Sequence, residues 1–357
     1  MAAQKSRLAL YLTLGYTLLV LYASLTPFSG WRDPGESALA WVSAPWPRYL
    51  AAFDVIVNVL AYVPLGFFAT LVAVPGARPW VAALIGVGAG FGLSFLLEVA
   101  QAYLPGRISN NLDLITNTLG AALGAMLAAR AGSAPRIRRR LESWRSRLFL
   151  PGGTIDLGMA LIALWFFSQL DPSLPLLGIV FFSDGIQAQL AGLGPHPLQR
   201  ILGPISVGTN LVSLGLLLML LMRSNRSALA ALGLLVWIAA LTKLIAATAL
   251  LRTEATFLWV SAEIVWAIAI GALVVGMAAL VPRHWVRVLC ALSLLGSVVL
   301  ALLKPGAAQS FLSLRLFRWS DVQLMHYTGL SGAVAGAWPY AALAYLALLW
   351  RRDRERV

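Results

Sequence analysis

The sequence has few charged residues for its length. Only 11% of its 357 residues are Asp, Glu, Lys or Arg, whereas 60% are hydrophobic. A chain of this size has too little polar surface to enclose a soluble globule. Apolar runs of about 18 residues or more, the length that crosses about 30 Å of hydrocarbon as a helix, recur from end to end. The composition therefore predicts a membrane protein.

Cysteine and histidine are also scarce. The single cysteine, Cys290, cannot form an internal disulfide, and His196, His284 and His326 are too scattered to predict a metal cluster. The sequence contains no GxSxG elbow, HExxH motif or Walker loop. Its net charge of +13 comes from basic residues between the apolar runs, with no nucleic-acid-binding module. We expect no metal, no cofactor and no nucleic-acid partner, and enzymatic activity stays open.

Ten apolar runs predict an all-α, polytopic membrane bundle of about ten transmembrane helices. The runs are 8–26, 51–74, 79–104, 112–130, 154–171, 201–222, 228–251, 257–281, 286–303 and 327–350. Placing both termini in the cytoplasm puts 18 of the 27 Lys and Arg residues on the inner side. This distribution agrees with the positive-inside rule, so we expect both termini to be cytoplasmic.

A basic segment divides the chain into two predicted membrane domains. Residues 1–131 hold four of the apolar runs, residues 132–153 form a basic cytoplasmic linker, and residues 154–357 hold six runs. The arginines of the linker fit an orientation signal on the inner leaflet. Docking of an acidic partner or of anionic lipid is the alternative.

Polar residues of the first domain are predicted to meet at one level of the membrane. On the second, third and fourth runs they are spaced three or four apart, which places each pair on one helix face near the outer end. The set is Asp54, Asn58, Glu98, Gln101, Arg107, Asp113 and Asn117. A charge at mid-membrane costs about 2.5–3.5 kcal/mol, so these groups should face one another or a wet cavity. The set holds three carboxylates and one guanidinium, a balance that suits a proton acceptor or a site for a polar headgroup or a cation. The alternative is that these side chains only hydrogen-bond one another and hold the helices together.

The second domain has polar candidates of its own. Lys243 and Glu263 are placed where they could pair across helices, and Asn210 is a further buried polar candidate. Asp171 follows an apolar run and precedes Pro172, which is typical of a solvated loop residue. Asn210, Lys243 and Glu263 are therefore the predicted intramembrane polar residues of the second domain, and Asp171 is not one of them.

At the polar positions the sequence resembles the VanZ-like family of integral membrane proteins over residues of about 8–130. The residues that carry the resemblance are Ser24, Leu25, Pro27, Phe28, Asp54, Asn58, Pro64, Leu65, Gly66, Glu98, Gln101, Arg107, Asp113, Asn117, Gly120 and Gly124. The resemblance implies a multi-pass protein of the bacterial cytoplasmic (inner) membrane with a role in cell-envelope physiology. The family's namesake is associated with low-level resistance to the glycopeptide teicoplanin. The six further runs are a C-terminal extension of the family pattern.

These observations lead to three hypotheses for function. The first is that the outer-leaflet polar site binds or moves an amphiphile, with membrane lipids and a lipid-linked envelope intermediate or glycolipid as partners. The second is an integral membrane enzyme acting on such a lipid, with Glu98 or Asp113 as general base. The third is a proton-coupled transporter. The ligand, the oligomeric state, the direction of any transport and the role of the last six runs stay open.

Overall fold

The computed structural model of the chain is an all-α membrane bundle. It describes residues 6–46, 52–172, 174–178, 197–253, 256–257, 259–303 and 322–354. In these residues eight helices are long and apolar enough to cross a membrane, and two further apolar helices are shorter. Each of the ten predicted runs coincides with one of these helices, so the predicted fold class is confirmed. The chain divides into two compact units, Met1–Arg145 and Ser146–Val357.

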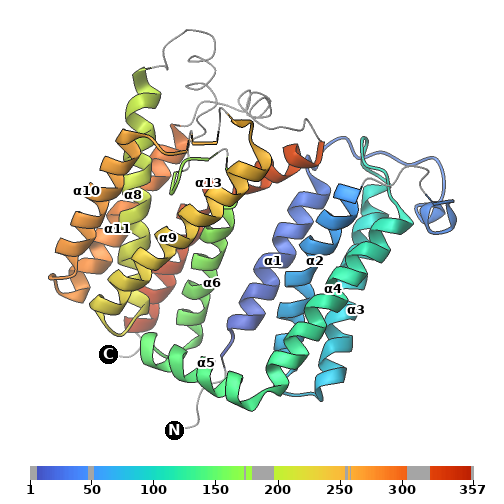
Figure 1. Cartoon of the computed structure of the whole chain (residues 1–357), viewed down its shortest axis with the longest axis horizontal. Coiled ribbons are helices and arrows are strands. Elements are labelled where there is room, and N and C mark those ends of the chain that lie inside the picture. Colours follow the sequence, from blue (N-terminus) through green and yellow to red (C-terminus); the bar gives the residue numbers. More distant parts are fainter. Residues whose placement is uncertain are drawn as a thin grey trace. The chain divides into compact units, whose positions relative to one another are not determined.

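The first unit is built on four long helices, α1 to α4 (Figure 1). Helices α2, α3 and α4 pack against one another, and α1 lies mainly against α2. A short 3-10 helix follows α1, and the basic helix α5 follows α4 and ends three residues beyond the first unit. The bounds are α1 Leu8–Leu25, η1 Ala40–Ser43, α2 Ala52–Ala73, α3 Pro79–Gln101, α4 Asn111–Ser133 and α5 Pro135–Leu148.

Two glycines of α4 allow it to lie directly on the backbone of α2. A Cβ atom added at Gly120 would overlap the carbonyl oxygen of Val59, and one added at Gly124 would overlap that of Val63. Small residues four apart permit this close approach of helices. The contact fixes the register of α2 against α4, and with it the relative position of the polar residues at their ends.

The second unit is arranged around α8. This helix packs against α9, α10 and α11, while α13 packs against α6 and α11. Helix α10 begins at Ala262, five residues later than predicted, because the Ser261 hydroxyl caps it by accepting from the Ile264 amide at 3.4 Å. The bounds are α6 Gly153–Ser168, α8 Pro197–Leu221, α9 Asn225–Leu250, α10 Ala262–Ala278, α11 Arg283–Leu302 and α13 Val322–Arg354.

Candidate functional site

The seven polar residues predicted in the first unit lie near one end of its helix bundle, and we call them the polar cluster. Their positions follow from the chain: α2 enters with Asp54 in its first turn, α3 ends at Gln101, and α4 begins at Asn111. Because α3 runs antiparallel to α2 and α4, the first turns of α2 and α4 lie level with the last turn of α3. The contacts within the cluster show what each side chain does.

Glu98 joins the end of α3 to the start of α4. Its carboxylate Oε2 accepts a hydrogen bond from the backbone amide of Asn110 at 2.9 Å, and Ser109 Oγ donates to the Glu98 carbonyl at 2.6 Å. Asn110 is the N-cap of α4, where its side chain accepts from the Leu112 amide. Glu98 is only 3% exposed, and the N-terminus of a helix favours a negative charge. The carboxylate therefore lies where the backbone of α4 stabilises it.

Asn58 connects α2 to α4. Its Nδ2 atom donates to Asp113 Oδ1 at 2.8 Å. Asp54, one turn before Asn58 on α2, is close enough to Asp113 for the two carboxylates to interact, and Asp113 interacts electrostatically with Glu98 as well. The structure thus gathers the three carboxylates that the sequence predicts in one region.

Arg107 and Gln101 hold the end of α1. Arg107 Nη2 donates to the carbonyl oxygens of Ala23 and Thr26 at 2.8 and 3.3 Å, and Gln101 Nε2 donates to that of Ser24 at 3.1 Å. The last carbonyls of a helix lack partners within it, and a cation there is favourable. Burial lowers the pKa of the Arg107 guanidinium below its ordinary value, and the charge of Glu98 opposes that shift.

A second polar layer lies one helical turn, or about 6 Å, deeper in the bundle. Asn117 Nδ2 donates to Ser94 Oγ at 3.0 Å, and Ser94 also forms a side-chain hydrogen bond with Tyr62. Sequence reasoning missed Tyr62 and Ser94, although each is four residues from a predicted residue, Asn58 and Glu98. The same i, i+4 spacing that found the first layer could have found the second.

Several polar atoms of the cluster have no hydrogen-bond partner within the part of the chain that the structure describes. They are Glu98 Oε1, Asp113 Oδ2, Arg107 Nε and Nη1, and the buried Asn117 Oδ1. The carboxylate and amide oxygens can accept hydrogen bonds from hydroxyl or amine groups, and the guanidinium can donate to an anion. Within the same residues, no group of three or more His, Cys, Asp or Glu side chains is placed to hold a metal ion.

Lys243, in the second unit, is fully buried in α9 and contacts the segment that follows α6. Its Nζ atom donates to the carbonyl oxygens of Asp171 and Leu174 at 2.5 and 3.0 Å. The ammonium therefore bonds to backbone oxygens and not to Glu263, with which the sequence suggested a pair. Asp171, expected in a solvated loop, is instead fully buried and accepts a hydrogen bond from Ser331 Oγ, because its segment folds back into the bundle beside Lys243.

Asn210 belongs to the same buried region. Its Nδ2 atom donates to the Leu177 carbonyl at 2.8 Å, and its Oδ1 atom accepts from Ser297 Oγ at 3.0 Å. Asn210 therefore ties α8 both to α11 and to the segment after α6. These contacts satisfy the polar atoms locally, and they explain how a polar residue is kept in an apolar span.

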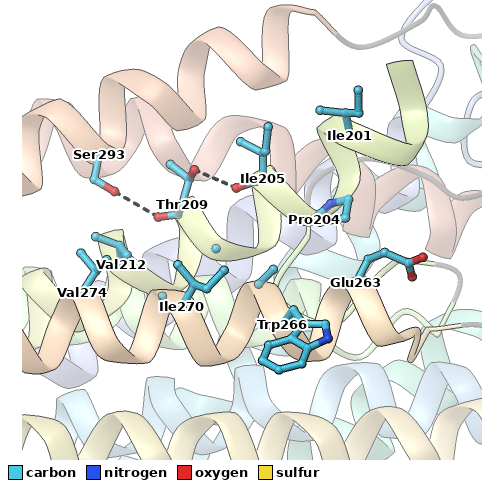
Figure 2. Close-up of a pocket in the computed structure, with 13 residues that line it drawn as sticks. Ile201, Pro204, Ile205, Thr209, Val212, Glu263, Trp266, Ile270, Val274 and Ser293 are labelled. Atoms are coloured by element: carbon cyan, nitrogen blue, oxygen red, sulfur yellow. Dashed lines mark hydrogen bonds between the residues drawn. The ribbon is translucent and has the colours of Figure 1, made fainter. Parts of the chain in front are cut away.

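Glu263 lines a different feature, an open groove of about 650 Å³ along α8, α10 and α11 (Figure 2). The groove wall is mostly apolar and includes Ile205, Trp266 and Ile270. Figure 2 shows Glu263 toward one end of the groove and Ser293 toward the other, where Ser293 Oγ donates to the Thr209 carbonyl at 3.0 Å. Glu263 therefore lines this groove, whereas Lys243 contacts the segment after α6.

The fold and the polar residues define a multi-pass membrane protein with a four-helix N-terminal unit and a further helical unit. Residues 4–132 match the family model described as VanZ/LLP1, so this part of the chain is a VanZ-like region, as the sequence resemblance indicated. The matched range contains the whole polar cluster, and the helices after it are a C-terminal extension. No curated protein and no solved structure matches the chain.

Proposed function

We propose that the polar cluster binds the headgroup of a cell-envelope amphiphile, such as a lipid-linked cell-wall intermediate or a glycolipid, in the outer leaflet of the bacterial inner membrane. The observation that carries this proposal is the set of unused polar atoms at one end of the bundle. Arg107 Nε and Nη1 would bind an anionic group, such as a phosphate. Glu98 Oε1 and Asp113 Oδ2 would accept from hydroxyl or amine groups of the same headgroup.

The position of the cluster in the bundle supports a headgroup as the ligand. The cluster residues lie in the end turns of α2, α3 and α4 and in the loop that joins α3 to α4. Charged groups are less costly near the interface than at mid-membrane, and headgroups lie at that level. The positive-inside rule, applied to the Lys and Arg residues, predicts that this end is the outer one.

The contacts already made within the cluster support binding rather than helix attachment alone. Asn58 fixes Asp113, the Asn110 amide fixes Glu98, and the end of α1 fixes Arg107, each through one side of the functional group. Groups held in this way lose little conformational entropy when a ligand arrives. An effect on glycopeptide resistance would follow if the ligand is a lipid-linked cell-wall intermediate.

Lipid retention by the purified protein tests the proposal. We expect Arg107→Ala and Asp113→Asn each to lower the affinity for the amphiphile by about tenfold or more, seen as less bound lipid by mass spectrometry, because a hydrogen bond to a charged group contributes about 1.5–3 kcal/mol. Arg78→Ala, at the opposite end of α3, is the matched charge control and should retain the lipid. Unchanged lipid in folded Arg107→Ala and Asp113→Asn protein would contradict the proposal.

A proton- or cation-coupled transport function is a second candidate, favoured by the charge balance of the cluster. The Arg107 hydrogen bonds go to backbone carbonyls of α1, while the carboxylates of Asp54, Glu98 and Asp113 act on one another. Crowded carboxylates favour uptake of a proton or a cation. Proton-dependent uptake into proteoliposomes would support transport if the Glu98→Gln substitution abolishes it. Uptake that is independent of pH for both the unsubstituted protein and the Glu98→Gln protein would exclude this function.

A further inference from the structure

Helix α5 carries an apolar stripe that is exposed along its whole length. Ile137, Leu141, Trp144 and Leu148 are 50, 59, 54 and 39% exposed, and the helix has no buried residue. At about 100° per residue these four side chains fall within an arc of about 60° on the helix surface. An apolar face this narrow and continuous indicates a helix whose partner is an apolar medium or surface.

Arginines flank the stripe on both sides. On the same helical wheel they lie about 70–110° from its centre, three on one flank and two on the other. The first flank is Arg136, Arg140 and Arg147; the second is Arg138 and Arg145. Long basic side chains in these positions can place their apolar stems beside an inserted face and their charges among headgroups. Glu142 is the one acidic residue of α5 and forms an exposed ion pair with Arg138 at 3.7 Å, so the helix stays strongly basic.

The connection to α4 keeps the start of α5 near a membrane surface. Helix α4 is long and apolar enough to cross a membrane, and helix α5 begins at Pro135, two residues after the end of α4 at Ser133. Its basic charge is complementary to a negatively charged leaflet, and its apolar stripe is complementary to the acyl chains just below. An acidic protein surface would match the arginines alone.

We propose that α5 is a binding helix for anionic lipid: it lies in the plane of the leaflet where α4 ends, with its stripe inserted and its arginines on anionic phospholipid headgroups. A basic residue near such a surface favours binding by about fivefold. The anionic preference is therefore cumulative over the flanking arginines. This proposal is independent of the polar cluster, which lies at the other end of α4.

Depth measurements on the full-length protein in vesicles test the insertion. A nitroxide spin label is attached at Leu141→Cys, on the stripe, or at Ser143→Cys, about 130° away from the centre of the stripe, as the matched control. Native Cys290 is fully buried, and unsubstituted protein reports any labelling there. In vesicles of phosphatidylcholine with phosphatidylglycerol we expect the label at 141 to be relaxed by oxygen and the label at 143 by a water-soluble nickel chelate.

Charge variants test the lipid preference. We expect a spin label at 141 to lie deeper with phosphatidylglycerol than in phosphatidylcholine alone. Combined Arg136→Gln, Arg140→Gln and Arg147→Gln substitutions should abolish that difference, and the same three substitutions to Lys should keep it. Nickel access at 141 in both vesicle types would overturn the proposal and point to a protein partner. Equal depth in both types, unchanged by the Gln substitutions, would overturn the anionic preference.

Discussion

Replacement of Lys243 by methionine is expected to destabilise the second unit strongly. The ammonium donates to the buried carbonyls of Asp171 and Leu174, and hydrogen bonds of a charged group contribute about 1.5–3 kcal/mol each. Methionine fills a similar volume, so the loss comes from the two unsatisfied carbonyls and from the electrostatic interaction between the ammonium and the Asp171 carboxyl group. Removing one partner of a buried polar pair costs about 3–5 kcal/mol, which corresponds to a fall in melting temperature of roughly 6–20 °C.

Thermal unfolding of the detergent-purified protein measures this effect. Leu241→Met is the control on the same helix, because its side chain is 42% exposed and should leave the melting temperature unchanged. The double variant Lys243→Met with Asp171→Asn should lose less stability than the two single variants together, since each removes a charge that the other balances. If the Lys243→Met protein has the same melting temperature as the unsubstituted protein, the claim that this ammonium holds the segment after α6 is refuted.

Three further predictions concern the first unit. Gly124→Ala should cost about 1–3 kcal/mol by forcing α4 off α2, whereas Gly88→Ala, with open space around it, should gain roughly 0.5–1 kcal/mol; thermal unfolding compares the two. Asn58→Asp should replace the donor to Asp113 by a second carboxylate, so that melting falls most at neutral pH and recovers in acid, where a protonated carboxyl can donate. Gln101→Ala should raise hydrogen–deuterium exchange severalfold in the last turn of α1, because one hydrogen bond of about 0.5–1.5 kcal/mol is lost.

The helices could be predicted from the sequence because lipid leaves the backbone few alternatives. A chain in hydrocarbon must satisfy its own backbone hydrogen bonds, so a long apolar run becomes a helix. The polar cluster could be predicted for a related reason. Residues three or four apart share a helix face. Because α2 and α4 run in the same direction, the early turns of both helices lie at one level, which brings Asn58 beside Asp113, and their side chains are hydrogen-bonded in the structure.

The partners of the basic side chains could not be predicted. Arg107 and Lys243 both donate to backbone carbonyls, at the end of α1 and after α6 respectively. Every residue has a carbonyl oxygen, so the sequence does not indicate which carbonyl will accept a hydrogen bond. An acidic side chain such as Glu263, in contrast, can be recognised in the sequence as a possible partner. The burial of Asp171 has the same origin, since it depends on how the segment after α6 folds back.

Helix α4 links the two proposals through its length. Its 23 residues span about 34 Å, slightly more than the hydrocarbon thickness of about 30 Å, with Asp113 in its first turn and α5 directly after its last. The polar cluster and α5 must therefore face opposite leaflets. Labelling of Ser143→Cys with a membrane-impermeant thiol reagent should occur only from the cytoplasmic side, which would place the polar cluster on the outer side. Labelling from the outer side alone would place α5 on the outer side and the polar cluster on the cytoplasmic side. An outer-leaflet headgroup site at the polar cluster would then be excluded.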